Sequence, residues 1–548
     1  MRVLFVYPNL YTQMGFNHGL ASLSAVLKRA GHECELVNLN ENLPPVPTHE
    51  QILERVRSGG YGLIGFSCLT QQYPAALELA QWLRAQSPDL PPLVVGGIHP
   101  TMVPEEVMAS GVWDYVGVGE CEDALLELVK RLERGEQPID VPNFLSWKDG
   151  VRRPGTREWI HNRVGEFPDF AALPMPDYEL FDTQRITDQK QGWFGLMSSR
   201  GCPYRCTYCL NHRIVDRYKE ELGRNVKGIG FFRFRSAEAM IEEIRWVLAR
   251  YRDIGTFILD DDLFTQNVPH ALAFCDLYEK SGIGVPFVVN SHVKQLDERV
   301  AEALSRAGCR ILKLGIESGS PRVRKEVLKR HMTQKDILET VASAERWRLH
   351  SSGFVMVGLP TETRAERQET VDLLAQTAIG RFRTSFFFPF PGTDGYRMAV
   401  ESGEYVPGRE LGLTDFTDRS CMDFGAEENL LVEKLGLCMP WFVNERLDRF
   451  REAPASLRYR PLVEKVLAMD AKQWAAFQPR IREIDGEYSR AAAAHDELHY
   501  AIRYNRFMGV RSDYYLAEEQ GQEWHTASAR PDQELRQAAL AAAASEVC

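Results

Sequence analysis

The chain has 548 residues, with 65 Lys and Arg against 76 Asp and Glu, which gives a net charge of −11. This acidic balance argues against a general nucleic-acid binder, because such proteins carry excess positive charge for the phosphate backbone. No apolar run approaches the roughly 20 residues that a membrane span needs, and the apolar stretch within residues 1–10 is too short for a secretory signal. Eleven scattered cysteines suit a reducing compartment. We therefore expect a soluble, cytoplasmic protein with neither a nucleic-acid partner nor membrane insertion.

The N-terminal part of the chain alternates short apolar segments with helical ones. A helix is expected from Leu20 to Ala30, because its apolar residues recur every three to four positions and Gly31 follows. The expected strands are residues 2–7, 33–37, 62–67, 93–96 and 115–118. This alternation predicts an α/β fold, a Rossmann-like doubly wound parallel sheet over residues 1–140, which binds ligands outside its strand carboxyl ends.

The middle of the chain repeats the strand-and-helix alternation. Residues 141–190 are rich in Pro, Asp and Gly and predict a linker. Expected strands then follow near residues 193–197, 257–263, 285–290, 311–316, 354–358 and 385–388. With charged helical segments between them, they predict a partial βα barrel of the TIM type over residues 191–402, with function at the strand carboxyl ends.

The last part of the chain has helical periodicity. Residues 427–442, 457–469 and 471–484 show apolar residues every three to four positions. We expect a mainly helical domain over residues 403–548, which could cap a substrate site.

Three cysteines, Cys202, Cys206 and Cys209, lie within a stretch of eight residues after the first expected barrel strand. Three thiolates this close in sequence can hold three corners of a [4Fe-4S] cluster, and no fourth cysteine follows nearby, so one iron stays open for a ligand. His212 leaves a Cys3His zinc site as the alternative.

The spacing Cys-x3-Cys-x2-Cys, with Tyr208 before the last cysteine, resembles the signature of radical S-adenosylmethionine (SAM) enzymes. In that family the open iron chelates the methionine part of SAM, and electron transfer cleaves SAM to a 5′-deoxyadenosyl radical. The resemblance implies an electron donor such as flavodoxin or ferredoxin. It also implies SAM contacts: Glu317 and Ser318 at the ribose and amino-acid end, Asp261 or Asp262 at the amino group, and Tyr208 at the adenine. His292 stands where many relatives carry arginine.

A second resemblance lies in the N-terminal part. Ser67-Cys68-Leu69 is followed after 26 residues by Gly96-Gly97, as in cobalamin-binding domains, where glycines let a long nucleotide tail lie against the backbone. The wider pattern resembles the domain attached to B12-dependent radical SAM enzymes. The cobalamin contacts that it implies are Ser67, Leu69, Gly96, Gly97, His99, Gly119 and Glu120.

The Asp-x-His-x-x-Gly element that gives cobalt a lower histidine ligand in other cobalamin proteins is missing from this sequence. His18 lies in the first loop, but Ala21 stands where the glycine would be. We therefore expect cobalamin bound without a protein histidine on the cobalt.

The two resemblances together imply a cobalamin-dependent radical SAM methyltransferase that acts on a carbon of a small-molecule substrate. One alternative is an oxidative cyclase or ring-remodelling enzyme that uses both cofactors without methylating. A second alternative is a non-catalytic zinc or iron–sulfur binding protein.

Overall fold

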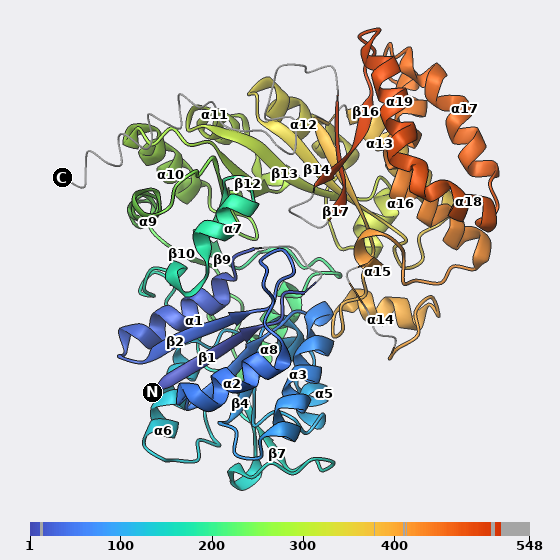
Figure 1. Ribbon diagram of the computed structural model, residues 1–548. Coiled ribbons are helices and arrows are strands. Elements are labelled where there is room, and N and C mark those ends of the chain that lie inside the picture. Colours follow the sequence, from blue (N-terminus) through green and yellow to red (C-terminus); the bar gives the residue numbers. More distant parts are fainter. Residues whose placement is uncertain (11–14, 378, 409–411, 413, 506–509, 517–548) are drawn as a thin grey trace.

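The computed structural model describes residues 1–10, 15–377, 379–408, 412, 414–505 and 510–516. Figure 1 shows two α/β units stacked on one another, the N-terminal one in blue and the central one in green and yellow, with orange and red helices beside the central unit. None of the helices in the described ranges is long and apolar enough to cross a membrane.

The first unit is built on a seven-stranded sheet in the order β2-β1-β3-β4-β5-β6-β7. The first five strands pair in parallel, and β6 and β7 add in antiparallel fashion. Its strands are β1 (Arg2–Tyr7), β2 (Glu33–Asn38), β3 (Leu63–Ser67), β4 (Leu93–Gly96), β5 (Tyr115–Gly117), β6 (Phe144–Trp147) and β7 (Trp159–His161). The expected doubly wound parallel sheet is confirmed.

Helices cover both faces of this sheet. They are α1 (His18–Arg29), α2 (His49–Gly59), α3 (Tyr73–Gln86), α4 (Ile98–Met102), α5 (Pro104–Ala109) and α6 (Glu122–Glu133). Along β1, Leu4 and Val6 pack into the core with α2 and α3, whereas Val3 and Phe5 pack into the core with α1 and α6. Because both faces of the strand are buried, β1 is a continuous apolar run.

The segment 141–190, expected to be a linker, contains β6 and β7 of the first sheet and helix α7 (Thr183–Gln189). Trp147 of β6 is buried, and its indole N–H donates to the carbonyl of Trp113 at 2.8 Å. The sheet thus continues past residue 140. Strands of three or four residues carry almost no periodic pattern, so the Pro- and Gly-rich composition was the stronger sequence feature here.

The second unit is a six-stranded sheet in the order β15-β14-β13-β12-β11-β8, with every pair parallel. Sequential parallel strands with intervening helices confirm the partial βα barrel. Its strands are β8 (Trp193–Leu196), β11 (Thr256–Leu259), β12 (Phe287–Ser291), β13 (Cys309–Glu317), β14 (His350–Val357) and β15 (Arg381–Phe386). Its helices are α8 (Asn211–Leu222), α9 (Ala237–Arg250), α10 (Val268–Ser281), α11 (Glu298–Arg306), α12 (Gln334–Arg346) and α13 (Arg364–Thr377).

The last part of the described chain is mainly helical, as expected. It comprises α14 (Asp394–Glu401), α15 (Thr414–Thr417), α16 (Ala426–Arg446), α17 (Ala455–Ala468), α18 (Ala471–Phe477) and α19 (Ile481–Ala493). Helix α16 packs on α13 of the barrel. A hairpin of β16 (Tyr500–Asn505) and β17 (Val510–Leu516), not expected from the sequence, places β17 beside β15. The expected domain extends to residue 548, and its end lies outside the described residues.

Candidate cofactor site between the two sheets

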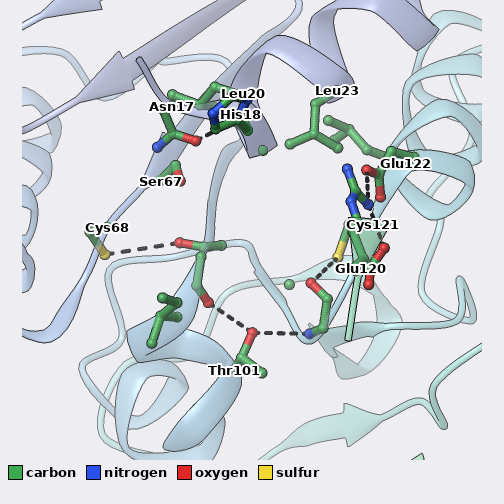
Figure 2. A pocket seen from close by; sticks show the side chains of 18 of the residues that line it. Asn17, His18, Leu20, Leu23, Ser67, Cys68, Thr101, Glu120, Cys121 and Glu122 are labelled. Atoms are coloured by element: carbon green, nitrogen blue, oxygen red, sulfur yellow. Dashed lines mark hydrogen bonds and ion pairs between the residues drawn. The ribbon is translucent and has the colours of Figure 1, made fainter. Parts of the chain in front are cut away.

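A cavity of about 390 Å³ lies where the carboxyl edge of the first sheet faces the mouth of the barrel. Figure 2 shows side chains around it from the start of α1, from the end of β3, from Thr101 of α4 and from the stretch Glu120 to Glu122. The barrel contributes the residues that follow β8 and β11. In a sheet of order 2-1-3-4-5 the ligand crevice opens where the strand order reverses, beside β1 and β3, which is the position of this cavity.

The wall formed by the first sheet is mostly backbone. Gly97 has φ of +99°, and a Cβ there would lie 2.7 Å from the carbonyl oxygen of Cys68. At Gly96 a Cβ would meet no atom within 4 Å. The Thr101 hydroxyl donates to the Gly97 carbonyl at 2.7 Å and accepts from the Gly119 N–H at 3.0 Å, so it joins two loops of the wall. The sequence argument gave Thr101 no role.

This wall fits a large flat ligand. Ser67, Leu69, Gly96 and Gly97 all line the cavity. Positions without a Cβ let a corrin side chain or nucleotide tail approach the backbone closely, and the Ser67 hydroxyl offers a hydrogen bond. Cobalamin is a ligand of this kind, so the residues present suit it.

The two histidines near this wall have different surroundings. His99 does not line the cavity: its ring lies against Tyr73, with centroids 4.4 Å apart, and burial lowers its pKa to about 4. His18 does line the cavity, and its Nε2 lies 3.4 Å from Oδ2 of Asp260 on the barrel side. His18 is therefore directed across the cavity to the barrel.

Gly119 and Glu120 join the two units. A Cβ at Gly119 would collide with the Tyr218 hydroxyl of α8. The carboxylate of Glu120 accepts hydrogen bonds from Arg200 and Arg233, which makes it a bridge to β9 (Ser199–Arg200) and β10 (Arg233–Phe234) of the central unit. Both residues line the cavity, but the contacts described here join the N-terminal unit to the central unit.

The three cysteines lie on the loop after β9. All three are free thiols, Cys206 is buried, and Cys202 and Cys209 are partly exposed. Burial raises the pKa of Cys202 and Cys209 to about 12 each. Thiols in such surroundings need a cation to hold them as thiolates, which iron supplies directly on binding. Soft sulfur donors on one loop suit a [4Fe-4S] cluster.

His212, the residue of the zinc alternative, is buried beside this loop. Its Nε2 lies 3.7 Å from Oδ2 of Asp394 in α14. In the part of the chain that the structure describes, no three His, Cys, Asp or Glu side chains are grouped to hold a single metal ion.

Tyr208 and Glu317 meet at the barrel mouth. The Tyr208 hydroxyl donates to Glu317 at 2.9 Å, and burial raises the pKa of Glu317. Arg330 completes the group: its guanidinium donates to the Tyr208 oxygen at 3.2 Å, to Cys206 Sγ at 3.4 Å and to the Gly315 carbonyl at 2.6 Å. The sequence argument missed Arg330, because it lies in the loop after β13, outside any strand end.

Of the paired acids, Asp262 lines the cavity and Asp261 does not. Asp261 is fully buried and accepts from the Ser198 N–H at 2.6 Å and the Ser199 hydroxyl at 2.8 Å, so its carboxylate fixes the chain after β8. Ser318 is also fully buried, with its hydroxyl 3.5 Å from that of Thr370 in α13.

His292 supports the cysteine loop. Its ring stacks on Tyr204, with centroids 4.0 Å apart and planes at 16°. Burial lowers the pKa of His292 to about 3, so the ring is neutral at ordinary pH. Its contact with the loop between Cys202 and Cys206 gives this departure from the family pattern a packing role.

Comparison with known families finds two matches along the chain. Residues 11–129 match the B12 binding domain, and residues 196–374 match the Radical SAM superfamily. An uncharacterised methyltransferase of Pyrococcus horikoshii is 28% identical over 386 residues, which cover 70% of this chain and 78% of the relative. The anaerobic magnesium-protoporphyrin IX monomethyl ester cyclase of Rubrivivax gelatinosus is 23% identical, covering 72% and 69%.

Two solved structures share the fold. The radical SAM methyltransferase TsrM of Kitasatospora setae, solved with cobalamin and a [4Fe-4S] cluster, has a TM-score of 0.57 at 18% identity, covering 74% of this chain and 76% of TsrM. The cobalamin-dependent SAM radical enzyme OxsB, solved with aqua-cobalamin and SAM, has a TM-score of 0.62 at 15% identity, covering 98% of this chain and 79% of OxsB.

Fold and site thus define a two-unit α/β protein with a cofactor cavity between a doubly wound sheet and a partial barrel. With its two family matches, the chain belongs to the B12-dependent radical SAM enzymes. The expected cofactors are thereby confirmed: a [4Fe-4S] cluster and SAM for the barrel, and cobalamin for the N-terminal unit. The individual contact residues stay predictions.

Proposed function

We propose that this protein is a cobalamin-dependent radical SAM methyltransferase, which moves a methyl group from SAM, by way of the cobalamin, to a carbon of a small molecule. The observation that carries the proposal is the shared cavity: Ser67 and Gly97 line it from the sheet, and Gly201, next to Cys202, lines it from the barrel. When bound, the cluster supplies the electron that cleaves SAM, and the cobalamin carries the methyl group.

The residues of this chain have separate tasks in that reaction. Cys202, Cys206 and Cys209 hold the cluster. Tyr208, Glu317 and Asp262 bind SAM beside it, with Arg330 holding Tyr208 in place. Methyltransferase relatives such as the one from Pyrococcus horikoshii support the reaction class. We further propose that a flavodoxin or ferredoxin supplies the electron.

The experiment needs no substrate. The anaerobically reconstituted enzyme is incubated with reduced cobalamin and SAM carrying a deuterated methyl group, and the cobalamin is analysed by mass spectrometry. Labelled methylcobalamin together with S-adenosylhomocysteine is the expected result.

Cobalamin that stays unlabelled while 5′-deoxyadenosine accumulates would favour the oxidative cyclase instead. The Rubrivivax gelatinosus relative makes that second candidate specific, since it matches 72% of this chain.

A further inference from the structure

The interior of the barrel carries a row of polar and charged residues below the cofactor cavity. In the strand register Asn290 pairs with Lys313, Lys313 with Ser352, and Ser352 with Arg381. Asp260 extends the row, because it follows Leu259, which pairs with Val289. This layer thus crosses the four strands β12 to β15 and continues to the residue after β11 without an apolar side chain.

This row faces the inside of the barrel. On β13 the neighbours Leu312 and Leu314 belong to the core beneath the outer helices, and side chains alternate along a strand, so Lys313 lies on the opposite face. Phe382 of β15 is in the same core, which places Arg381 and Arg383 inside the barrel as well. Barrel interiors of this type are usually filled by branched apolar side chains, so a row of this polarity needs a reason.

Several cationic side chains surround Lys313. Burial lowers the pKa of Lys313 to about 8, with Asp260 acting to raise it and Arg383, Arg381 and Lys190 acting to lower it further. The Asp260 carboxylate, which lies 3.4 Å from His18, acts through space on both Lys313 and Lys190. A buried ammonium beside other cations is costly unless an anion joins it.

Part of this region is accessible to solvent. Asn290 and Lys313 of the row are each partly exposed, and so is Lys190, which directly follows α7. Gly315, whose carbonyl accepts from Arg330 at the mouth, lies two residues further along β13. At about 3.3 Å per residue, Lys313 is about 7 Å deeper than that point, below the layer of the cysteine loop.

We propose that the barrel binds its methyl acceptor through an anionic group, a phosphate, phosphonate or carboxylate, held by Lys313 and Lys190. This assignment rests on the proposed function, because it names the substrate class of the same site. An anion between the two lysines satisfies both ammonium groups and fixes the acceptor below the cofactors, with its other end directed to the cavity.

The test uses the anaerobic holoenzyme with cluster and cobalamin loaded and with saturating SAM, so that the SAM site is filled. Methylphosphonate and acetate are titrated separately by calorimetry at constant ionic strength. We expect saturable binding of at least one of them to the unaltered enzyme. Lys313→Met should weaken it at least about tenfold and Lys313→Arg should retain it. Tighter binding of methylphosphonate would indicate a substrate with a phosphate or phosphonate group, and tighter binding of acetate would indicate a carboxylate.

Lys472→Met is the matched control, because Lys472 is exposed on α18. It should leave anion binding unchanged. Formation of 5′-deoxyadenosine and the cobalamin content show whether each variant is folded and carries its cofactors. If Lys313→Met is not folded, Lys190→Met replaces it.

Absence of saturable binding to the unaltered enzyme, or equal binding to Lys313→Met, would overturn the inference. The deuterated-methyl experiment is separate. Unlabelled cobalamin beside Lys313-dependent anion binding would refute the methyltransferase proposal and leave the anionic substrate class standing.

Discussion

The two walls of the cofactor cavity are built from different materials. The wall of the first sheet presents glycines, backbone carbonyls and hydroxyls, as at Gly96, Gly97 and Thr101. The barrel side presents ionisable side chains: Arg200, Asp260 and Asp262 line the cavity, and the pairs Cys206–Arg330 and Glu317–Tyr208 lie at the barrel mouth outside that lining. The difference follows from the tasks: a large neutral macrocycle is bound by shape, whereas a cluster and a charged nucleoside are bound by specific donors.

This contrast implies that the walls fail in different ways. A change in the barrel wall should remove chemistry and leave cobalamin bound. A change in the sheet wall should remove cobalamin and leave SAM cleavage.

The largest effect is expected for Cys202→Ala. Loss of one of the three proposed cluster ligands should abolish 5′-deoxyadenosine formation, because no fourth cysteine lies on that loop to replace it. Chromatography measures the 5′-deoxyadenosine formed, and the absorbance of cobalamin measures how much of it stays bound. Cys275→Ala, at a buried thiol of α10, is the control and should keep both. Continued SAM cleavage by Cys202→Ala would refute the cluster assignment.

The next largest effect is expected for Gly97→Ala. The added Cβ would lie 2.7 Å from the Cys68 carbonyl oxygen, at φ of +99°, so this part of the cavity lining must shift. We expect cobalamin affinity to fall at least about tenfold, which corresponds to the roughly 1–3 kcal/mol of strain at such a position. SAM cleavage should persist.

Gly135→Ala is the matched control for that experiment. Gly135 also has a positive φ, of +73°, but a Cβ there would meet no atom within 4 Å, and it does not line the cavity. Equal loss of cobalamin in both variants would show that backbone strain alone, and not the wall, was measured.

A smaller effect is expected for Glu120→Gln, which weakens the bridge between the walls. The Glu120 carboxylate accepts hydrogen bonds from Arg200 and Arg233. A hydrogen bond to a charged group contributes about 1.5–3 kcal/mol to stability. The thermal midpoint of the holoenzyme should fall. Glu401→Gln, in an exposed pair with Arg397, should change it far less. Equal changes in the thermal midpoint of the two variants would show that Glu120 does not stabilise the contact between the two units.

The smallest effect is expected for Tyr208→Phe. The ring stays, but the hydrogen bonds with Glu317 and Arg330 are lost. We expect SAM binding to weaken by a factor of about 3–10, the value of one net hydrogen bond, with iron content unchanged. Equilibrium dialysis with labelled SAM measures it, and Tyr488→Phe on α19 is the control. Lost iron would instead give the hydroxyl a role in cluster assembly.

Sequence reasoning succeeded best where pattern and chemistry are local. The parallel strands of the first sheet follow from short, largely apolar runs, and the cysteine spacing predicts a cluster loop. It was weaker for β6 and β7, since short antiparallel strands lack a periodic pattern.

Individual contacts were harder to foresee. Asp261 and Ser318 sit at strand ends, as a SAM contact would, yet both side chains are buried in packing contacts. Arg330 had no local sign at all, although it touches Cys206 and Tyr208. The position of a residue at a strand end follows from the strand itself. Which groups its side chain contacts depends on the segments that pack against it.

The sequence by itself determined the two α/β units, the position of three cysteines on one loop and the glycines at the edge of the first sheet, because each depends on residues close together in the chain. The tertiary structure alone decided that the walls share one cavity, that Glu120 joins them through Arg200, and that Lys313 lies in a polar row inside the barrel. Those facts depend on strand register and on packing between units, which arise from contacts between residues far apart in the sequence.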